Sequence, residues 1–363
     1  MKLAVFEQEE FFEAHEFSCE LMLALSGVQP LTTRELTELV GEPSPDAEVG
    51  YTPSAGYHDL REAIAALHPP ARAENVMVTV GAIEAWLLLS NILLGPGDEL
   101  LCLWPAYQPL HELARGAGAE VRFVTLREER GFAIDLDEIE AAIGPRTRVV
   151  MLNVPHNPTG QTVSPEALRA FAARVRDRAV TVVVDEVFRE MRREHPPSAW
   201  DGQPNLVTMG SMSKSYGLPG LRIGWLLATP ELAVTARRYR KYTSLNPGSQ
   251  DQLLALAALR NRTRLLERSH RLTEEGARLA TRWLAEHEDT FRVVPPAAGG
   301  LFFPRLVRDE PTLDFCNRLV RDTKVLLAPG SACYGTEGFL RLGAATPHLE
   351  EGLARIDAWL RGR

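Results

Sequence analysis

Short apolar runs that alternate with helical patterns constrain the fold of this chain more than any other feature of its sequence. Between residues 76 and 210, each run is nearly free of polar side chains and ends at a turn. A strand that is apolar on both faces must be covered on both faces, as in a parallel sheet between helices. The sequence therefore predicts an α/β fold, with strands over 76–80, 99–103, 120–126, 149–154, 180–184 and 206–210, and helices over 83–94, 109–116 and 166–176.

The pattern changes after Pro230, where helical periodicity prevails and the strand-like runs become short. This change predicts a second, smaller α+β domain. We expect an N-terminal segment over 1–45 that packs with the small domain, a large domain over 46–250 and a small C-terminal domain over 251–363. In the small domain the pattern predicts helices over 273–287 and 313–322, and strands over 291–294, 301–304, 325–328 and 339–342.

Composition and charge disfavour several classes of function. A net charge of -8 over 363 residues gives no general attraction to nucleic acid or to an anionic membrane. The longest apolar run, 85–94, is too short to span a bilayer, and the N-terminus lacks the apolar core of a signal peptide. None of the four cysteines belongs to a C-x-x-C pair, which is typical of free thiols in a reducing cytoplasm. We therefore expect a cytoplasmic protein with no nucleic-acid, membrane or metal partner.

Chemically distinctive residues follow the predicted strands. In open α/β sheets, ligands bind beyond the carboxyl ends of the strands, so residues at these positions are expected to share one site. Packing alone does not account for unusual residues at several equivalent places. The residues concerned are Gly81, Tyr107, Asn157, Asp185 and Lys214.

Lys214 is one of four lysines in a chain with 40 basic residues, and it lies between small hydroxyl residues and a Gly/Pro turn. Elsewhere this chain uses arginine as its surface cation. Arginine cannot act as a nucleophile, whereas lysine can form a Schiff base with a carbonyl group. The alternative interpretation is a solvated loop lysine.

Other residues after the predicted strands could bind a phosphate or a cationic ring. The turn at Gly81 opens a helix whose free N–H groups suit a phosphate, although glycine there can serve geometry alone. Ser211, Ser213 and Arg222 could add charge-assisted hydrogen bonds. Asp185 ends a valine-rich strand and needs a cationic partner, such as a protonated pyridine nitrogen, unless it caps a helix.

Three further residues also have a functional and a structural interpretation. The amide of Asn157 could donate to a phenolate oxygen, or the residue could simply form the turn. The ring of Tyr107 could stack on a flat cofactor or pack in the core. Arg341 is a lone charge in an apolar strand, where it could bind a substrate carboxylate or form a structural salt bridge.

Together these motifs resemble those of the class I/II aminotransferases, the fold type I enzymes that use pyridoxal 5′-phosphate (PLP). The resemblance runs from about Tyr51 to the C-terminus. It implies a large domain with a mostly parallel seven-stranded sheet between helices, a smaller C-terminal domain and a homodimer with shared active sites. It also implies an activity, the transfer of an amino group between an L-amino acid and a 2-oxo acid.

The resemblance assigns roles residue by residue. Lys214 would form the internal aldimine and move the proton, Asp185 would pair with the pyridine nitrogen, and Asn157 would donate to O3′ of the cofactor. Tyr107 would stack on the ring, and Tyr51 would reach the phosphate of the other subunit. The phosphate cup would comprise Gly81, Ala82, Ile83, Ser211, Ser213 and Arg222, and the substrate would contact Gly27, Asn157 and Arg341.

Departures from the family pattern leave the reaction type open. Phe188 stands where many relatives have tyrosine, so a second hydrogen bond to O3′ is missing. The segment 26–28 and the lysine motif also resemble capreomycidine synthase-like members. They predict, as an alternative, a PLP-dependent lyase or cyclase of a substituted amino acid such as an arginine derivative. Glu13, Glu16 and Glu20 could pair with its guanidinium group or form a solvated helix face.

A third alternative is a transcription regulator with an aminotransferase-like effector domain. Such a regulator needs a DNA-binding module ahead of the matching region, and the acidic N-terminal residues do not have the charge of one. We therefore expect an enzyme.

Overall fold

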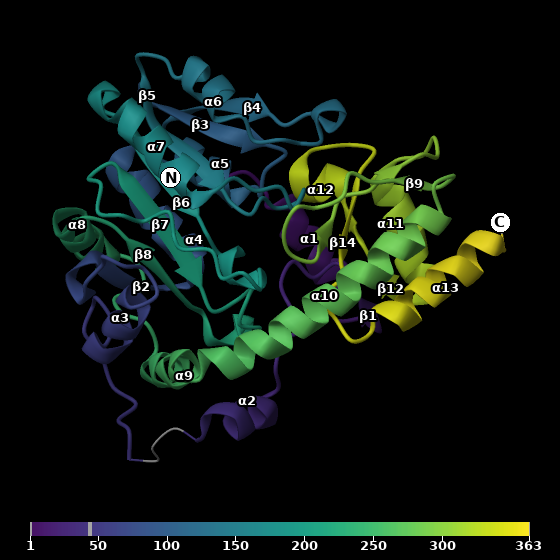
Figure 1. The fold of residues 1–363 in the computed structure, drawn as a ribbon, viewed down its shortest axis with the longest axis horizontal. Helices are drawn as coiled ribbons and strands as arrows, with labels where there is room; N and C mark the ends of the chain where they lie inside the picture. Colours follow the sequence, from purple (N-terminus) through teal and green to yellow (C-terminus); the bar gives the residue numbers. More distant parts are fainter. Residues whose placement is uncertain (1, 43–45, 363) are drawn as a thin grey trace.

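A seven-stranded sheet forms the centre of the protein (Figure 1). The computed structural model describes residues 2–42 and 46–362. In this sheet β8 alone runs against the others, because it pairs antiparallel with the strand on each side, β2 and β7. The predicted mostly parallel seven-stranded sheet is thereby confirmed. In spatial order the strands are β2 (Val76–Val80), β8 (Ile223–Leu227), β7 (Leu206–Ser211), β6 (Thr181–Asp185), β5 (Thr147–Asn153), β3 (Glu99–Trp104) and β4 (Glu120–Thr125).

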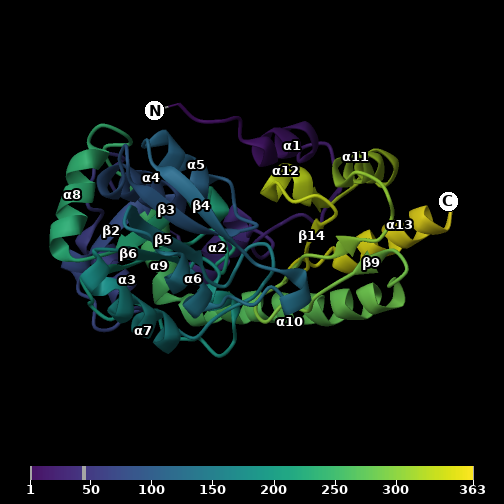
Figure 2. The same ribbon diagram turned by 90° about the horizontal axis from the view of Figure 1, so that it is seen from above.

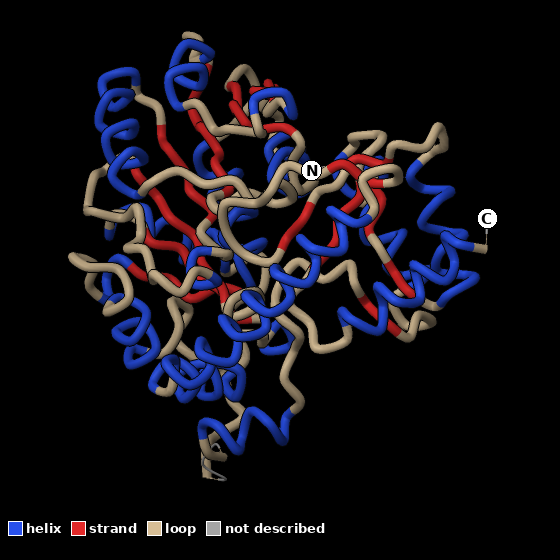
Figure 3. The backbone as a smooth tube through the Cα atoms, turned by 45° about the vertical axis from the view of Figure 1, so that its right-hand side comes forward, coloured by secondary structure: helices blue, strands red, loops and turns tan. Residues whose placement is uncertain are grey.

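Helices cover both faces of the sheet, as the tube drawing shows (Figure 3). One face packs against α4 (Gly81–Leu93), α5 (Pro109–Gly116) and α8 (Pro230–Arg240); the other packs against α3 (His58–Ala65), α6 (Leu136–Ala142), α7 (Pro165–Val175) and α9 (Ser249–Arg260). Successive side chains of a strand point to opposite faces. In β6, Val182 and Val184 therefore join the core under α6 and α7, whereas Val183 joins the core under α4 and α5. This two-sided burial explains why three consecutive valines precede Asp185.

The C-terminal part of the chain is a smaller α+β unit built on short strands (Figure 1). The strands pair as β10-β14-β13 and as β11-β9. Their bounds are β9 (Phe291–Arg292), β10 (Leu301–Phe302), β11 (Arg305–Leu306), β12 (Val325–Leu326), β13 (Ala328–Pro329) and β14 (Leu340–Gly343). The helices are α10 (Arg262–Glu286), α11 (Thr312–Thr323), α12 (Gly330–Tyr334) and α13 (Leu349–Arg361).

The N-terminal segment contacts both parts of the chain. It contains α1 (Glu7–His15), β1 (Leu21–Met22) and α2 (Thr33–Val40). Helix α1 lies beside α12, and β1 pairs in parallel with β12 (Figure 2). Helix α2 begins with a capping box between Thr32 and Glu35 and buries Leu36 in the core formed with α3 and α9. The domain limits expected at residues 45 and 250 stay a prediction.

Several elements differ from the sequence-based expectation, and β8 and α10 show two of the reasons. Strand β8 was not predicted, because its short run follows a Gly/Pro turn and contains Gly224, which weakens a strand pattern. Helix α10 begins at Arg262, well before the expected start at residue 273, because its first turns are rich in arginine and carry little apolar periodicity.

Other expectations concern thiols, metals and membranes. All four cysteines are free thiols, and Cys102, Cys316 and Cys333 are buried. Across residues 2–42 and 46–362, no three side chains of the metal-binding types gather at one place. No helix of the same residues has both the length and the apolar character needed to cross a membrane.

Gly224 provides a test of the contact between β8 and the turn that opens α4. A Cβ atom at this position would lie 2.5 Å from the amide nitrogen of Ala82 and against the backbone of Gly81. Backbone cannot move aside as a flexible side chain does, so we expect Gly224→Ala to lower the free energy of unfolding by about 1–3 kcal/mol. Urea unfolding checks the value. Gly220→Ala is the control, since a Cβ there meets open space; equal stabilities for the two variants would contradict the contact.

Candidate active site

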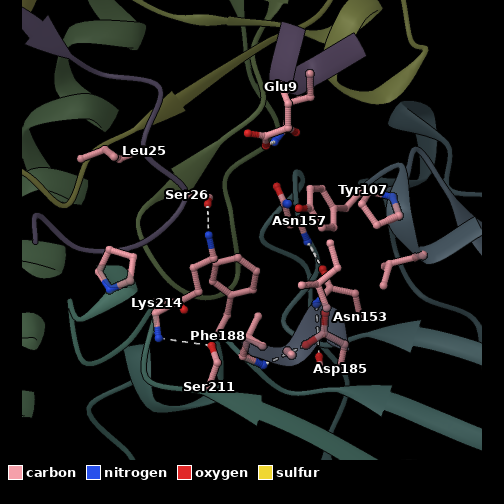
Figure 4. A pocket seen from close by; sticks show the side chains of 18 of the residues that line it. Glu9, Leu25, Ser26, Tyr107, Asn153, Asn157, Asp185, Phe188, Ser211 and Lys214 are labelled. Carbon is pink, nitrogen blue, oxygen red and sulfur yellow. Dashed lines mark hydrogen bonds between the residues drawn. The ribbon is translucent and has the colours of Figure 1, made fainter. Parts of the chain in front are cut away.

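A cavity of about 580 Å³ lies at the carboxyl edge of the sheet, where the N-terminal segment crosses it (Figure 4). The loops that follow the strands supply most of its chemically active side chains, and β14 supplies one more. The predicted site residues that line it are Ala82, Ile83, Tyr107, Asn157, Asp185, Ser211, Ser213, Lys214, Arg222 and Arg341.

Lys214 follows β7 and points its amine into this cavity, where Nζ donates to Oγ of Ser26 over 2.7 Å (Figure 4). Burial lowers the pKa of this amine to about 8, and the positive charge of Arg341 acts in the same direction. Asp185 opposes the shift. An amine with a pKa near neutrality is available both as a nucleophile and as a base, which an ordinary surface lysine is not.

Asp185 ends β6 and faces the same cavity (Figure 4). Burial raises the pKa of its carboxyl group to about 7, although Oδ1 accepts a hydrogen bond of 3.2 Å from the amide of Val187 and the charge of Lys214 favours ionisation. One backbone donor does not compensate a buried carboxylate. The site is therefore prepared for a cation that binds against Asp185.

A cradle for an anion lies at the start of α4. Arg222 adopts a left-handed backbone conformation, with φ of 49°, that turns its guanidinium group toward Gly81. A Cβ atom at Gly81 would lie 2.5 Å from Nη2 of Arg222, so only glycine leaves this space open. Ser211 accepts a hydrogen bond of 3.3 Å at Oγ from the amide of Ser213. Free amides at a helix start, two hydroxyls and a guanidinium group together suit a phosphate dianion.

Asn157 and Arg341 meet through a residue of α12. Tyr334 donates from its hydroxyl to Oδ1 of Asn157 over 2.6 Å and accepts from Nη1 of Arg341. Nη2 of Arg341 donates to the carbonyl oxygen of Ala24, and its buried Nε has no hydrogen-bond partner. No carboxylate of the described residues pairs with this guanidinium group. Among the described residues, Arg341 therefore does not form the structural salt bridge that the sequence left open as its alternative role.

Tyr107 and Phe188 are among the aromatic residues that line the cavity. Tyr107 lies edge-on to Phe6 of the N-terminal segment, with ring centroids 5.6 Å apart, and burial raises the pKa of its hydroxyl. Phe188 lies near Lys214 and carries no hydroxyl group (Figure 4). Phe188 therefore offers no hydrogen bond from its side chain to a ligand in this cavity.

Three predicted site residues do not line the cavity. Gly81 lies behind the guanidinium group of Arg222. Gly27 lies behind Lys214, and a Cβ atom there would come within 2.9 Å of the Cα atom of Lys214. Tyr51 is 89% exposed and outside the cavity.

The sequence interpretation missed several residues of the site. Ser26 binds Lys214, Glu9 of α1 points into the cavity, and Asn153 accepts at Oδ1 from the amide of Asn157 over 2.7 Å (Figure 4). Of the glutamates expected near the entrance, Glu16 lines the cavity, whereas Glu20 pairs with Arg355. These residues lie in segments whose approach to the site depends on tertiary packing, so no local motif indicated them.

Comparison with known proteins identifies the family. The family model for aminotransferase class I and II matches residues 43–356. This chain belongs to the class I and II aminotransferase family. Capreomycidine synthase of Streptomyces vinaceus is 36% identical over 343 residues, which cover 92% of this chain and 85% of that protein.

Solved structures agree with this assignment. A PLP-dependent aminotransferase from Streptococcus suis 89-1591 superposes with a TM-score of 0.93 at 31% identity, covering 100% of this chain and 99% of the other. The PLP-dependent cyclase OrfR superposes with a TM-score of 0.91 at 30% identity, covering 100% and 98%. The resemblance seen in the sequence is confirmed, and the cofactor of this family member is pyridoxal 5′-phosphate.

The residues present fit that cofactor. Its phosphate matches the guanidinium group of Arg222, for which Gly81 leaves room, and its pyridine nitrogen, when protonated, matches the uncompensated carboxylate of Asp185. Its aldehyde matches the desolvated amine of Lys214. The residues of these three matches lie at the ends of different strands, on one edge of the sheet. Each offers a charge or a reactive group that has no full partner within the protein.

Asp185→Asn is expected to stabilise the cofactor-free protein above neutral pH. Because burial raises the pKa of Asp185 to about 7, the folded protein binds this proton more tightly than the unfolded chain does. Wild-type stability from this group is thus greatest at low pH and falls as pH rises through about 7. We expect the variant to unfold at a higher free energy at about pH 8, by up to about 4 kcal/mol, and the difference to shrink toward about pH 4.

Urea unfolding of the apoprotein across this pH range checks the result. Asp309→Asn removes an exposed carboxyl group and serves as the control, with no such pH dependence expected. A destabilised Asp185→Asn apoprotein at every pH would contradict the expected cost of burying the charge, since the Oδ1 atom of asparagine can still accept from the amide of Val187.

Proposed function

We propose that this protein is an aminotransferase that moves an amino group between an L-amino acid and a 2-oxo acid. The observation that carries the proposal is one cavity that presents the amine of Lys214 and the guanidinium group of Arg341. Neither cation forms an ion pair with a carboxylate of the described residues. The carboxylate of an α-amino acid suits the guanidinium group of Arg341, and the amine of Lys214 is left to act as a base on the α carbon.

Arg341 would bind and orient the substrate carboxylate. Its planar fork suits two parallel hydrogen bonds to a carboxylate, and its burial strengthens them. Asn157 would lie beside this carboxylate, and Gly27 would border it where the N-terminal segment passes Lys214. Held in this way, the substrate presents its α carbon toward Lys214.

Lys214 would move the proton on which the reaction depends. When bound, the cofactor supplies a conjugated, protonated ring that accepts the electron pair left by deprotonation of the substrate α carbon. Nζ of Lys214, with its pKa lowered to about 8 by burial, would remove that proton and deliver it to the neighbouring carbon of the cofactor. Asp185 would keep the ring nitrogen protonated, and Tyr107 would hold the ring plane. The N-terminal segment, including α1, would restrict water over these groups.

A lyase or cyclase acting on a substituted amino acid is the second candidate. Its support is the 36% identity to capreomycidine synthase and the structural match to the cyclase OrfR. Such an enzyme would use the same deprotonation by Lys214 and would then expel a group from the substrate side chain. The carboxylates of Glu9 and Glu16 line the cavity and could receive a cationic side chain, such as that of an arginine derivative.

Transfer of heavy nitrogen distinguishes the two candidates. The PLP-loaded protein is incubated with a panel of amino acids labelled at the α nitrogen, together with an unlabelled 2-oxo acid. We expect mass spectrometry to find the label in the amino acid formed from that 2-oxo acid. Lys214→Ala should slow the transfer by about 10²–10⁴-fold, because it removes the base, while Lys241→Ala, on an exposed turn, should leave it unchanged. Labelled ammonia or a cyclised product without transfer would refute the aminotransferase and support the second candidate.

We also propose that two chains form a homodimer in which Tyr51 reaches the neighbouring cofactor phosphate. The support is a large aromatic residue that is 89% exposed on its own chain. In this arrangement Lys214→Ala damages the site of its own chain, whereas Tyr51→Ala damages the site of the partner.

Mixing the two variants tests this arrangement. Hybrid dimers formed after co-expression contain one site with both damaged residues and one site with neither. We expect about a quarter of wild-type activity when the two chains are expressed equally and pair at random, since half of the dimers are hybrids and each regains one of two sites. No recovery above the parents, with hybrids confirmed by differential tags, would place Tyr51 outside the partner's site.

A further inference from the structure

We propose that Tyr334 is a positioning residue that fixes the amide of Asn157 and the fork of Arg341 in one directed hydrogen-bond chain. The proposal rests on the proposed use of Asn157 toward the cofactor and of Arg341 toward the substrate. Tyr334 itself does not line the cavity, so it acts through these two residues.

The direction of the chain follows from the donors available. Arginine has only donors, so Nη1 of Arg341 must donate to the hydroxyl oxygen of Tyr334. Burial raises the pKa of Tyr334, and the hydroxyl therefore keeps its single proton. That proton is directed to Oδ1 of Asn157 over 2.6 Å. If the Asn157 amide were flipped, two donors would meet the tyrosine oxygen and its proton would have no acceptor.

A fixed Oδ1 determines where the other end of the amide points. The backbone of Asn157 is held separately, because its N–H donates to Oδ1 of Asn153 over 2.7 Å, and Asn153 donates in turn to the carbonyl oxygen of Asp185 over 3.2 Å. With its backbone and its oxygen both fixed, Asn157 keeps Nδ2 free as a donor. This matters more here because Phe188 lacks the hydroxyl that would supply a second donor.

Tyr334 also connects the two parts of the chain. It ends α12, whereas Asn157 follows β5 of the central sheet. The ring of Phe303 packs edge-on against the tyrosine ring, with centroids 5.7 Å apart, and the guanidinium group of Arg341 lies 5.7 Å from the ring centre. The hydroxyl is thus held rigidly at the boundary, and the substrate and cofactor ends of the site share one support.

Tyr334→Phe tests the inference, because it keeps the ring and removes only the hydroxyl. The first measurement is a pH titration of the visible absorbance of the bound cofactor. A donor on the phenolate oxygen stabilises the deprotonated chromophore, so a freely rotating Asn157 should raise the chromophore pKa. The variant Asn157→Ala should raise it similarly, and the double variant should add little beyond either single change.

The second measurement separates positioning from general stability. We expect kcat/KM for the amino acid to fall roughly tenfold to a hundredfold in Tyr334→Phe, the scale of one hydrogen bond to a charged group, with KM rising because Arg341 loses a fixed partner. Tyr239→Phe removes a hydroxyl on α8, away from the cavity, and should change neither value. Thermal melting of each apoprotein shows whether the variants fold. If Tyr334→Phe does not fold, Tyr334→Met provides a second variant without the hydroxyl group.

The spectral titration needs only bound cofactor, so it decides the role of Tyr334 even where no amino acid of the panel reacts. A failed amino-transfer assay with a raised chromophore pKa would refute the proposed reaction and support the positioning role. A wild-type chromophore pKa in folded Tyr334→Phe would overturn the positioning role, whatever the reaction.

Discussion

The burial of ionisable groups at the carboxyl edge of the sheet is the constraint on which the rest of this site depends. Asp185 and Lys214 are both removed from water. Burial raises the pKa of Asp185 and lowers the pKa of Lys214, so each group favours its neutral form. Their mutual attraction only reduces these shifts. A folded protein keeps such groups when a ligand supplies the missing charge or bond, and the proposed contacts of the cofactor would supply both. In the apoprotein the buried carboxyl group of Asp185 costs stability, and a bound cofactor would remove that cost.

Much of this edge could be predicted from the sequence because strands covered on both faces are apolar throughout. A polar residue such as Asp185 or Asn157 then marks where a strand ends, and parallel strands bring their ends to one edge. Tyr334 and Ser26 could not be found in this way. Tyr334 is the last residue of a five-residue helix, and Ser26 lies in a bend between β1 and α2. Each reaches the site only through packing between distant parts of the chain.

The N-terminal segment illustrates how such packing completes the site. Its N-terminal end is tied to the large domain, because the amide of Glu7 donates to Oε1 of Gln108 over 3.2 Å. Farther along, His15 hydrogen-bonds Asn317 of α11 over 2.9 Å. The same segment then passes Arg341 at Ala24 and Lys214 at Ser26. The sequence left Glu16 open between contact with a guanidinium group and a solvated helix face; the structure places Glu16 on the cavity wall, together with Glu9, which the sequence interpretation did not name.

The reaction type is decided where this segment meets the substrate side chain. In their proposed roles, Lys214, Asp185 and the phosphate cradle would serve any reaction that begins with loss of the α proton, so they would not distinguish transfer from elimination or cyclisation. Arg341 would bind the carboxylate that all amino acids share. What remains to distinguish the outcomes is the wall that faces the side chain, to which α1 contributes Glu9 and Glu16. Substitutions on that wall should change which products form, whereas substitutions at Lys214 should abolish all of them.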